Sequence, residues 1–492
     1  MVSNRLPVTC ECHAAEVVIR PSAGGLVAAL LPLMRLQGNC WVGWTGTAYD
    51  PRIENALKYP SPDLPLGCLV PVFLTETERA LFYRGCSNEI IWPLFHDLPS
   101  RCVFGPEYWS TYREVNEKFA DSVEQLTRRD DFVWVHDYHL MLLGEALRTR
   151  DLPARLAYFH HIPFPCPDVF EKLPWRNEVL RALLQFDEIG VQTLRDQENL
   201  IACVRRYIGE VHVDQIGARL LLRIGRRCVA LACQPVSIDY EQFSAPASAD
   251  RVAATAENFQ ARHGSTKIIL GVDRLDYTKG IAERLEAFRT LLAEHPALAG
   301  TVTMRQVVVP SRDDIPAYKE VKARIEALVS NINEEHGTPD WTPVDYHYGS
   351  VSNACLLALY RAAHVALITP LRDGMNLVAK EYCAARCDER GVLVLSEFAG
   401  SAAELKQGAM LVNPYDTEAV AAAIHRALEM PEEEQRARMK AIRGWIRTHN
   451  VYRWAQALCG ADYSRNADQV ASVAPAQTSY PHAKHFSAAA WD

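Results

Sequence analysis

The sequence predicts an α/β protein with two doubly wound domains that face each other across a cleft. The alternation of strand and helix patterns runs once before a hinge near residues 234–239 and starts afresh after it. Unbroken apolar runs such as residues 365–368 are typical of parallel strands covered on both faces. Polar and charged residues follow several of these runs, at the sheet edge where open α/β proteins bind ligands. A chain of 492 residues is long enough for two such domains.

The block before the hinge alternates expected strands and helices. The expected strands are residues 1–5, 41–44, 132–135, 155–159 and 188–192. The expected helices are residues 22–37, 76–84, 107–128 and 167–186. Residues 6–21 are expected to form an irregular loop. Residues 50–70, which are rich in proline and turn formers, are expected to form a surface excursion.

The block after the hinge repeats the alternation. Its expected strands are residues 267–272, 301–309, 365–368, 391–395 and 410–412. Its expected helices are residues 316–337, 416–430 and 432–448, the first of which begins at a proline that suits a first helical turn. Residues 463–492 are rich in Ala, Ser, His and Pro without periodicity, which predicts a disordered tail.

Composition and charge exclude several classes of function. The chain carries 52 basic and 60 acidic residues, a net charge of −8, which argues against a general nucleic-acid or membrane-surface role. No apolar run approaches the roughly 20 residues that span a bilayer, and the start, Met1 to Arg5, lacks the apolar segment of a signal peptide. We therefore expect a cytoplasmic protein in which the 14 cysteines are free thiols.

Two groups of residues invite a metal interpretation. Cys10 and Cys12 precede His13, but no second CxxC or matching His pair accompanies them. His136 and His139 follow a predicted strand, where nothing supplies a third ligand and the spacing is not that of a helical metal motif. The sequence therefore predicts no metal site.

The stretch of residues 369–382 carries the clearest chemical pattern. A buried strand, a tight turn with Asp373 and Gly374, and a helix start leave backbone N–H groups free at the carboxyl edge of the sheet, an arrangement that favours phosphate. Asp373 can accept hydrogen bonds from sugar hydroxyls. Glu381 lies about two helical turns further on and suits the hydroxyls of a ribose. The turn therefore predicts a nucleotide-sugar pocket, with a plain helix cap by Asp373 as the alternative.

A basic cluster follows the strand of residues 267–272. Arg274 and Lys279 lie five residues apart in one loop, and with the helix start at Gly374 they would surround a diphosphate. Fixed cations and amides stabilise the negative charge that grows on a leaving diphosphate. The alternative is that Asp273 and Asp276 neutralise these cations in a solvated turn.

The sequences of many separated motifs resemble those of the trehalose-6-phosphate synthase family of retaining glycosyltransferases. The matching motifs lie in order between residues 2 and 455. They are residues 3–5, 24–25, 41–44, 92–93, 136–140, 161–165, 274–280 and 369–382. The chain departs from the usual sequence of the family in its short first strand, in Ser237 of the hinge and in residues 348–352.

The resemblance implies a GT-B architecture, in which two Rossmann-like domains face a cleft. The implied domains are residues 1–236, completed by a C-terminal helix at about 446–460, and residues 237–445. The implied reaction joins UDP-glucose and glucose 6-phosphate to give α,α-trehalose 6-phosphate and UDP with retention of configuration. It needs no cofactor, since UDP-glucose is a substrate, and similar enzymes are thought to use no protein nucleophile.

The resemblance also implies site residues, carried over position by position. Donor-binding residues would be Gly25, Arg274, Lys279, Leu356, Asp373, Gly374, Met375, Asn376, Leu377 and Glu381. Acceptor-binding residues would be Arg5, Tyr83, Trp92, Asp137 and Arg312, with the two arginines on the phosphate. The residues closest to the chemistry would be Arg274, Lys279, Asp137 and His161.

Two other functions stay open at this point. A related glucosylglycerol-phosphate synthase uses ADP-glucose and glycerol 3-phosphate. A non-catalytic regulatory subunit of a trehalose-making complex would have lost pocket residues, and none is lost here. The expected partners are small-molecule substrates, with no nucleic acid and no membrane. Whether the protein forms a homo-oligomer, such as a dimer or tetramer, is left open.

Overall fold

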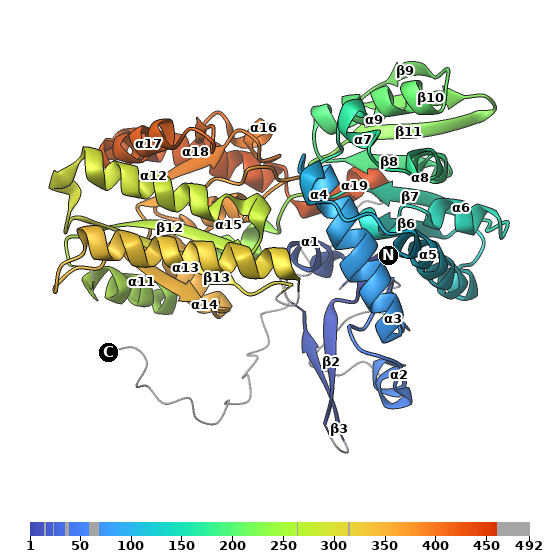
Figure 1. The fold of residues 1–492 in the computed structure, drawn as a ribbon, viewed down its shortest axis with the longest axis horizontal. Helices are drawn as coiled ribbons and strands as arrows, with labels where there is room; N and C mark the ends of the chain where they lie inside the picture. The colour runs from blue at the N-terminus through green and yellow to red at the C-terminus, as the bar shows by residue number, and fades with distance from the viewer. Residues whose placement is uncertain are drawn as a thin grey trace.

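Two mainly parallel sheets organise the chain in the computed structural model (Figure 1). The structure describes residues 1–13, 16–22, 24–34, 39–58, 68–262, 264–312 and 315–459. The first sheet has strand order β5-β4-β1-β6-β7-β8-β11-β10-β9, and the second has order β14-β13-β12-β15-β16-β17. In Figure 1 the second sheet lies on the left and the first on the right. The predicted α/β fold with two doubly wound sheets is confirmed.

The first sheet is built from the chain before the hinge. Its strands are β1 (Val2–Arg5), β4 (Cys40–Trp44), β5 (Cys68–Val72), β6 (Phe132–His136), β7 (Arg155–Phe159), β8 (Glu188–Val191), β9 (His212–Ile216), β10 (Arg219–Ile224) and β11 (Arg227–Cys233). The helices are α1 (Gly25–Met34), α2 (Pro51–Lys58), α3 (Glu76–Glu78), a π-helix (Arg79–Ile91), α4 (Trp92–Phe95), α5 (Pro106–Leu126), α6 (Leu143–Arg148), α7 (Pro167–Phe170), α8 (Arg176–Leu183) and α9 (Leu194–Tyr207). Short 3₁₀ turns lie at Pro99–Arg101 and Tyr138–Leu140.

The second sheet is wholly parallel and is built from the chain after the hinge. Its strands are β12 (Lys267–Arg274), β13 (Val302–Val309), β14 (Val344–Tyr348), β15 (Val365–Ile368), β16 (Val392–Ser396) and β17 (Met410–Val412). The helices are α10 (Tyr240–Ala247), α11 (Asp250–Arg262), α12 (Ile281–Glu294), α13 (Pro316–His336), α14 (Asn353–Ala362), α15 (Leu377–Ala385), α16 (Ala402–Leu405), α17 (Thr417–Glu429), α18 (Glu432–Thr448) and α19 (Val451–Cys459). Further 3₁₀ turns lie at Tyr277–Lys279 and Pro296–Leu298.

Side chains alternate between the two covered faces of each sheet, as the period of a strand requires. On β6, Val133 and Val135 enter the apolar cluster beneath α5, while Trp134 between them enters the cluster that contains residues of α1 and α19. On β12, Ile268 and Leu270 point to one cluster and Ile269 to another. Burial on both faces explains why these strands are unbroken apolar runs in the sequence.

Each sheet has a point at which successive strands begin to be added on the opposite side, and these two points position the site. In the first sheet the reversal lies between β1 and β6, and in the second it lies between β12 and β15. Open α/β sheets bind ligands just beyond the carboxyl ends of the strands at such a reversal. Arg5 and Arg274 are the last residues of β1 and β12, and Asp137 and Asp373 lie in the loops after β6 and β15.

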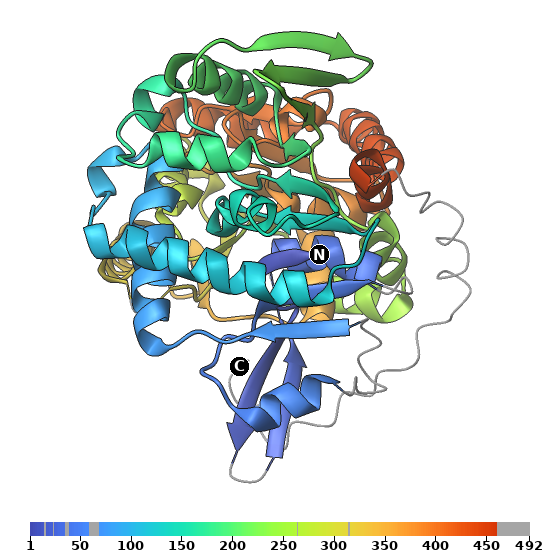
Figure 2. The same cartoon turned by 90° about the vertical axis from the view of Figure 1, so that its right-hand side faces the viewer.

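One expectation for the N-terminal region is wrong. Residues 8–13 and 16–21, expected in an irregular loop, form the antiparallel strands β2 (Val8–His13) and β3 (Glu16–Pro21), which extend away from both sheets (Figures 1 and 2). The alternation of apolar Val8 and Cys10 with polar residues is a strand signal, and both of these side chains are buried. The surface excursion at 50–70 contains helix α2 and the start of strand β5.

The last helix returns to the first sheet. The Trp454 ring on α19 lies 4.8 Å from the Trp134 ring and 5.0 Å from the Phe159 ring. The helix expected at 446–460 therefore exists, although it begins at Val451 after a break from α18. The expected helix end near Gln37 and the expected tail at 463–492 lie outside the described residues.

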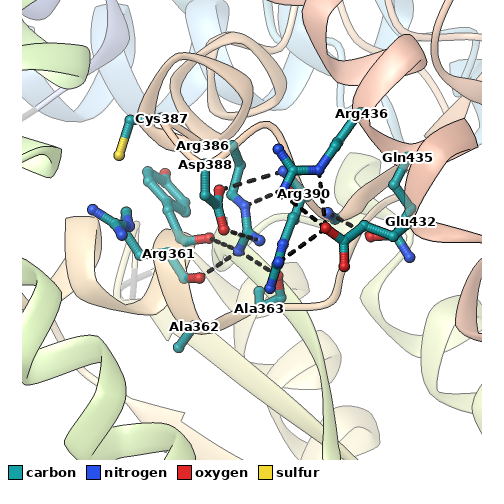
Figure 3. A network of polar contacts seen from close by, with 12 residues as sticks. Arg361, Ala362, Ala363, Arg386, Cys387, Asp388, Arg390, Glu432, Gln435 and Arg436 are labelled. Atoms are coloured by element: carbon teal, nitrogen blue, oxygen red, sulfur yellow. Dashed lines mark hydrogen bonds and ion pairs between the residues drawn. The ribbon is translucent and has the colours of Figure 1, made fainter.

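A polar network fixes α14 and α15, two helices that border the second reversal point (Figure 3). The Arg386 guanidinium donates to the carbonyl of Ala363 at 2.7 Å and to the Asp388 carboxylate at 3.0 Å. Arg390 pairs with Glu432 at 2.9 Å, which connects this turn to the start of α18. The backbone carbonyls at the end of α14 are thereby satisfied by a charged side chain, which limits movement between α14 and α15.

A buried ion pair lies below the loops at the second reversal point. The Arg284 guanidinium is 2.5 Å from the Asp273 carboxylate, and neither side chain is more than 2% exposed. Arg284 also donates to Gln306 at 3.1 Å and to the hydroxyl of Thr369 at 3.1 Å. These contacts join β12, β13 and the strand-end residue that precedes the donor turn.

We predict that Arg284→Met lowers the free energy of unfolding by about 3–5 kcal/mol, because it leaves the Asp273 charge buried and unpaired. Urea unfolding followed by circular dichroism measures the change. The double variant Asp273→Leu, Arg284→Met removes both charges and is expected to recover most of the loss. Equal midpoints for wild type and Arg284→Met contradict the assignment of this pair as a structural requirement.

Candidate active site

The donor turn is joined to the basic loop by an ion pair between buried groups. The Lys279 ammonium lies 2.6 Å from the Asp373 carboxylate, and the side chains are 12% and 13% exposed. The amide of Asn376 also donates to Asp373, at 3.2 Å. Burial alone would raise the pKa of Asp373, but the Lys279 charge and hydrogen bond hold it below the ordinary value. Asp373 is therefore an ionised acceptor at neutral pH.

Neither predicted alternative for this region describes the structure. Asp273 pairs with Arg284, and Asp276 lies 3.4 Å from Arg312, so these acids do not neutralise the basic loop. Arg274 is exposed and forms no ion pair within the described part of the chain. The helix cap after the donor turn is Asn376, whose side chain accepts from the N–H of Ala379 at 3.2 Å, and not Asp373.

Glycines allow the loops of the two sheets to touch. A side chain at Gly374 would overlap the backbone carbonyl of His161, which follows β7 in the first sheet. A side chain at Gly400 would overlap the carbonyl of Gly374. Gly280 has φ of +63°, and a side chain there would overlap the carbonyl of Thr369. The predicted tight turn thus exists, although α15 begins three residues after Gly374, at Leu377.

Helix α15 places Glu381 below the donor turn. The hydroxyl of Tyr360, on α14, donates to the Glu381 carboxylate at 2.9 Å. Burial raises the pKa of Glu381 to about 7. Near neutral pH the carboxyl group of Glu381 is therefore about half protonated. At slightly alkaline pH it is mostly ionised and can accept hydrogen bonds.

The remaining predicted donor residues gather around the same helix start. A Cβ on Gly25, at the start of α1, would lie 3.5 Å from the Leu377 side chain. Leu356 on α14 packs with Leu377 and Val378 against one apolar cluster. The starts of α1 and α15, which belong to different sheets, therefore lie side by side, with an apolar patch on one flank.

Three of the five predicted acceptor residues, Arg5, Tyr83 and Arg312, line one cavity, whereas Trp92 and Asp137 are not among its lining residues. A cavity of about 440 Å³ is lined by Arg5, Trp44, Gly46, Arg79, Tyr83, Arg84, Ser311 and Arg312. The Arg5 guanidinium lies 4.6 Å above the Trp44 ring, and the Arg312 guanidinium lies 4.4 Å above the Trp92 ring. The structure thus brings Arg5 and Arg312, from the two sheets, to one cavity.

Arg312 is held in place by several acceptors. Its backbone has φ of +54°, and its guanidinium contacts the hydroxyl of Tyr318, the carboxylate of Asp276 at 3.4 Å and the hydroxyl of Tyr138 at 3.4 Å. Burial would lower the pKa of Arg312, but these neighbours hold it well above the ordinary value. The charge is therefore permanent and its direction is fixed before any ligand binds.

Asp137 occupies a strained position between the two parts of the site. It has φ of +75°, and its Oδ1 atom is buried without a hydrogen-bond partner in the described regions. Burial raises the pKa of Asp137 to about 7, against the opposing effect of N–H groups of Tyr138 and His161 and of the Arg312 and Arg274 charges. A ligand hydroxyl would satisfy the buried oxygen.

His161, which is half-buried, pairs with the buried imidazole of His136. Its Nε2 lies 3.1 Å from Nδ1 of His136, so one ring donates to the other. Burial lowers the pKa of His161 to about 3, and the pKa of His136 is also lowered. Both rings are therefore neutral over the physiological range. His136 is fully buried, so His161 is the ring that can offer a hydrogen bond, but not a charge, to a sugar hydroxyl.

Several residues of the site were not found from the sequence. Arg79 and Arg84 line the acceptor cavity, Tyr360 bonds to Glu381 and His136 bonds to His161. His139, which invited a metal interpretation together with His136, lies parallel to the Tyr83 ring at 6.0 Å. Within the described ranges, no group of three or more His, Cys, Asp or Glu side chains is placed to hold a metal ion. No described helix is long and apolar enough to cross a membrane.

Comparison with known proteins finds relatives that are named as trehalose-6-phosphate synthases. The chain is 39% identical to a trehalose-6-phosphate synthase of Mycobacterium avium over 467 residues, 94% of each chain. It is also 39% identical to a bifunctional trehalose-6-phosphate synthase/phosphatase of Thermoproteus tenax, and it spans 62% of that longer relative.

Solved structures agree in fold. An α,α-trehalose-phosphate synthase (UDP-forming) of Burkholderia xenovorans in complex with glucose-6-phosphate superposes with a TM-score of 0.84 at 34% identity, covering 93% of this chain and 97% of that one. An Escherichia coli protein bound with UDP-2-fluoro glucose superposes with a TM-score of 0.83 at 31% identity, covering 93% and 98%. The profile of glycosyltransferase family 20 matches residues 1–461, and this chain belongs to that family.

Proposed function

We propose that this protein transfers glucose from UDP-glucose to glucose 6-phosphate and releases α,α-trehalose 6-phosphate and UDP with retention of configuration. The observation that carries the proposal is the convergence of Arg5 and Arg312, from different sheets, on one cavity. A phosphorylated sugar fits the side chains of this region. Its phosphate suits the arginines, and its sugar ring and hydroxyls suit the aromatic rings and Asp137. The same activity is named for relatives that align over nearly the whole chain.

The donor side is assigned to the turn after β15 and its surroundings. Arg274, Lys279 and the backbone amides of residues 374–377 would hold the diphosphate. Asp373 would accept hydrogen bonds from the glucose hydroxyls, and Glu381 would accept them from the ribose. Leu356 would flank the uracil, while Gly25, Met375, Asn376 and Leu377 shape the space in which the donor lies.

The acceptor side is assigned to the cavity and the residues beneath it. Arg5 and Arg312 would bind the phosphate, because planar guanidinium groups match phosphate oxygens in pairs. Tyr83 and Trp92 would contact the sugar, and the unpartnered Oδ1 of Asp137 would accept one of its hydroxyls. Neutral His161 would contact the glucose of the donor.

The reaction follows from these positions. The bond between the anomeric carbon and the diphosphate oxygen breaks, and a bond from the same face forms to the anomeric hydroxyl oxygen of the acceptor. The leaving phosphate takes the proton of that hydroxyl. Arg274 and Lys279 stabilise the negative charge that grows on the diphosphate. No protein nucleophile, metal ion or cofactor takes part in this proposal.

Product analysis tests the proposal directly. The purified protein is offered UDP-, ADP- and GDP-glucose with glucose 6-phosphate, glucose or glycerol 3-phosphate. We expect trehalose 6-phosphate from UDP-glucose and glucose 6-phosphate, with free glucose almost ignored. Faster transfer from ADP-glucose to glycerol 3-phosphate would establish a glucosylglycerol-phosphate synthase instead. Absence of transfer to every acceptor would indicate a regulatory subunit.

We predict that Arg274→Ala lowers turnover by about 10²–10³-fold while the melting temperature stays unchanged, because this exposed side chain has no structural partner and faces the leaving group. Arg251→Ala, an exposed arginine on α11, serves as the matched control and should retain full turnover. Lys279→Ala should lower turnover similarly and also lower the melting temperature, because it leaves Asp373 buried without its cation. Normal turnover in Arg274→Ala would remove the residue from the mechanism.

We predict that Glu381→Gln has opposite effects on stability and on binding. Because the folded pKa of Glu381, about 7, lies above its ordinary value, its contribution to stability is complete at low pH and is lost as pH rises through 7. The neutral variant should therefore unfold with a free energy about 1–3 kcal/mol higher than wild type at pH 8, and nearly equal to it at pH 5.

In the same variant UDP binding should weaken by about 10–100-fold at pH 8, because a charge-assisted bond to the ribose is lost. Calorimetric titration with UDP measures this effect beside the unfolding curves. Glu257→Gln, an exposed residue on α11, is the control and should change neither quantity. Unchanged UDP affinity in Glu381→Gln refutes the ribose assignment even if the stability effect is found.

A further inference from the structure

The acceptor cavity holds two arginines beyond those assigned to the phosphate. Arg79 and Arg84 line it together with Arg5 and Arg312. We infer that Arg79 and Arg84 are specificity-determining residues that bind the phosphate of the acceptor in its doubly charged form. This inference rests on the proposed function, since it concerns the acceptor of that reaction.

The π-helix explains how both side chains reach one cavity. In a π-helix the hydrogen bonds join residues five apart, so Arg79 and Arg84 lie one turn apart on the same face, with Tyr83 beside them. In an α-helix the same spacing would turn Arg84 by about 140° away from Arg79. Gly85 allows this helix to lie against the Tyr108 ring, which a side chain there would overlap. The unusual helix therefore has a consequence for the charge of the cavity.

The cavity gathers positive charges that act on one another. Burial lowers the pKa of the Arg5 guanidinium, and the positive charge of Arg79 lowers it further. Arg79 lies 3.2 Å from Glu76 and Arg84 lies 3.7 Å from the same residue. The Glu76 side chain is 70% exposed, so water screens its attraction. Positive charge gathered in this way in a protein of net charge −8 indicates an anionic ligand of high charge.

The charge of a phosphate ester changes near neutral pH. Its second proton is lost with a pKa of about 6, so the singly and doubly charged forms exchange within the working range of the enzyme. Each additional guanidinium favours the doubly charged form, since the attraction grows with the charge of the ligand. Arg79 and Arg84 should therefore make acceptor binding stronger and more dependent on pH.

Steady-state kinetics with Arg79→Gln, Arg84→Gln and the double variant test the inference. Each single change should raise the KM for glucose 6-phosphate about tenfold or more, because one hydrogen-bonded charge contact is lost. The kcat and the KM for UDP-glucose should change less than about twofold. Arg113→Gln, an exposed arginine on α5 away from the cavity, removes the same charge and should leave all three constants unchanged.

Glu76→Gln gives a test with the opposite sign. If Arg79 and Arg84 bind the phosphate, removing the competing carboxylate should lower the KM for glucose 6-phosphate. If the two arginines serve only to hold the start of the helix through Glu76, then Glu76→Gln and Arg84→Gln will both lower the melting temperature and leave this KM unchanged. That result overturns the inference.

Binding of inorganic sulfate separates this inference from the proposed function. Sulfate stays doubly charged between pH 5.5 and 8, so its affinity for wild type should vary little with pH, whereas that of glucose 6-phosphate should fall below about pH 6. Sulfate should bind the arginine variants more weakly. If no trehalose 6-phosphate is formed but the variants still lose sulfate binding, the subsite stands and the acceptor is another phosphate ester. If trehalose 6-phosphate is formed and the variants keep wild-type KM and sulfate affinity, the subsite assignment is wrong.

Discussion

The contact between Gly374 and the backbone of His161 determines how the two halves of the site meet. The donor turn approaches the first sheet so closely that a side chain at Gly374 would overlap the His161 carbonyl. Gly400 supports the turn from behind with equal closeness. Because three segments pack without side chains between them, the donor turn has little freedom relative to the loop after β7. A substitution at either glycine would therefore shift the donor turn, and with it the groups proposed to bind the sugar, without changing the chemical nature of those groups.

Near that contact, burial and ion pairing give the titratable side chains different charge states. Asp373 stays ionised because Lys279 lies against it, whereas Asp137, which lacks such a close cation, has a pKa raised to about 7. His161 is neutral because partial burial beside a second imidazole lowers its pKa. The cleft thus holds a fixed anion, a titrating acid and a neutral donor within neighbouring loops. Such differences between similar groups are typical of sites that bind several hydroxyls and a growing charge.

The sequence allowed much of this to be predicted, for identifiable reasons. Parallel strands such as residues 365–368 are unbroken apolar runs, and the donor turn follows directly from its local pattern. The hairpin of β2 and β3 was not predicted, because the alternation in β2, where Thr9 and Glu11 stand between apolar residues, resembles the mixed polarity of a loop. Arg79 and Arg84 lie outside the motifs that carry the family resemblance, so they were not predicted as site residues. The partner of Lys279 lies 94 residues away in the chain, so no local pattern could reveal the pair. The division between domains at residues 236 and 237 stays a prediction.

The phosphate of the acceptor has a role beyond affinity in this architecture. Arg5 ends strand β1 of the first sheet and Arg312 follows strand β13 of the second, so an anion bound between them would attract both halves of the molecule at once. In the proposed function the reacting hydroxyl is at the opposite end of the acceptor sugar from the phosphate. Binding energy gained at the phosphate can therefore hold the cleft closed around a reaction that the phosphate does not enter. An acceptor without that group would lose turnover as well as affinity, which is how a cavity remote from the chemistry comes to control it.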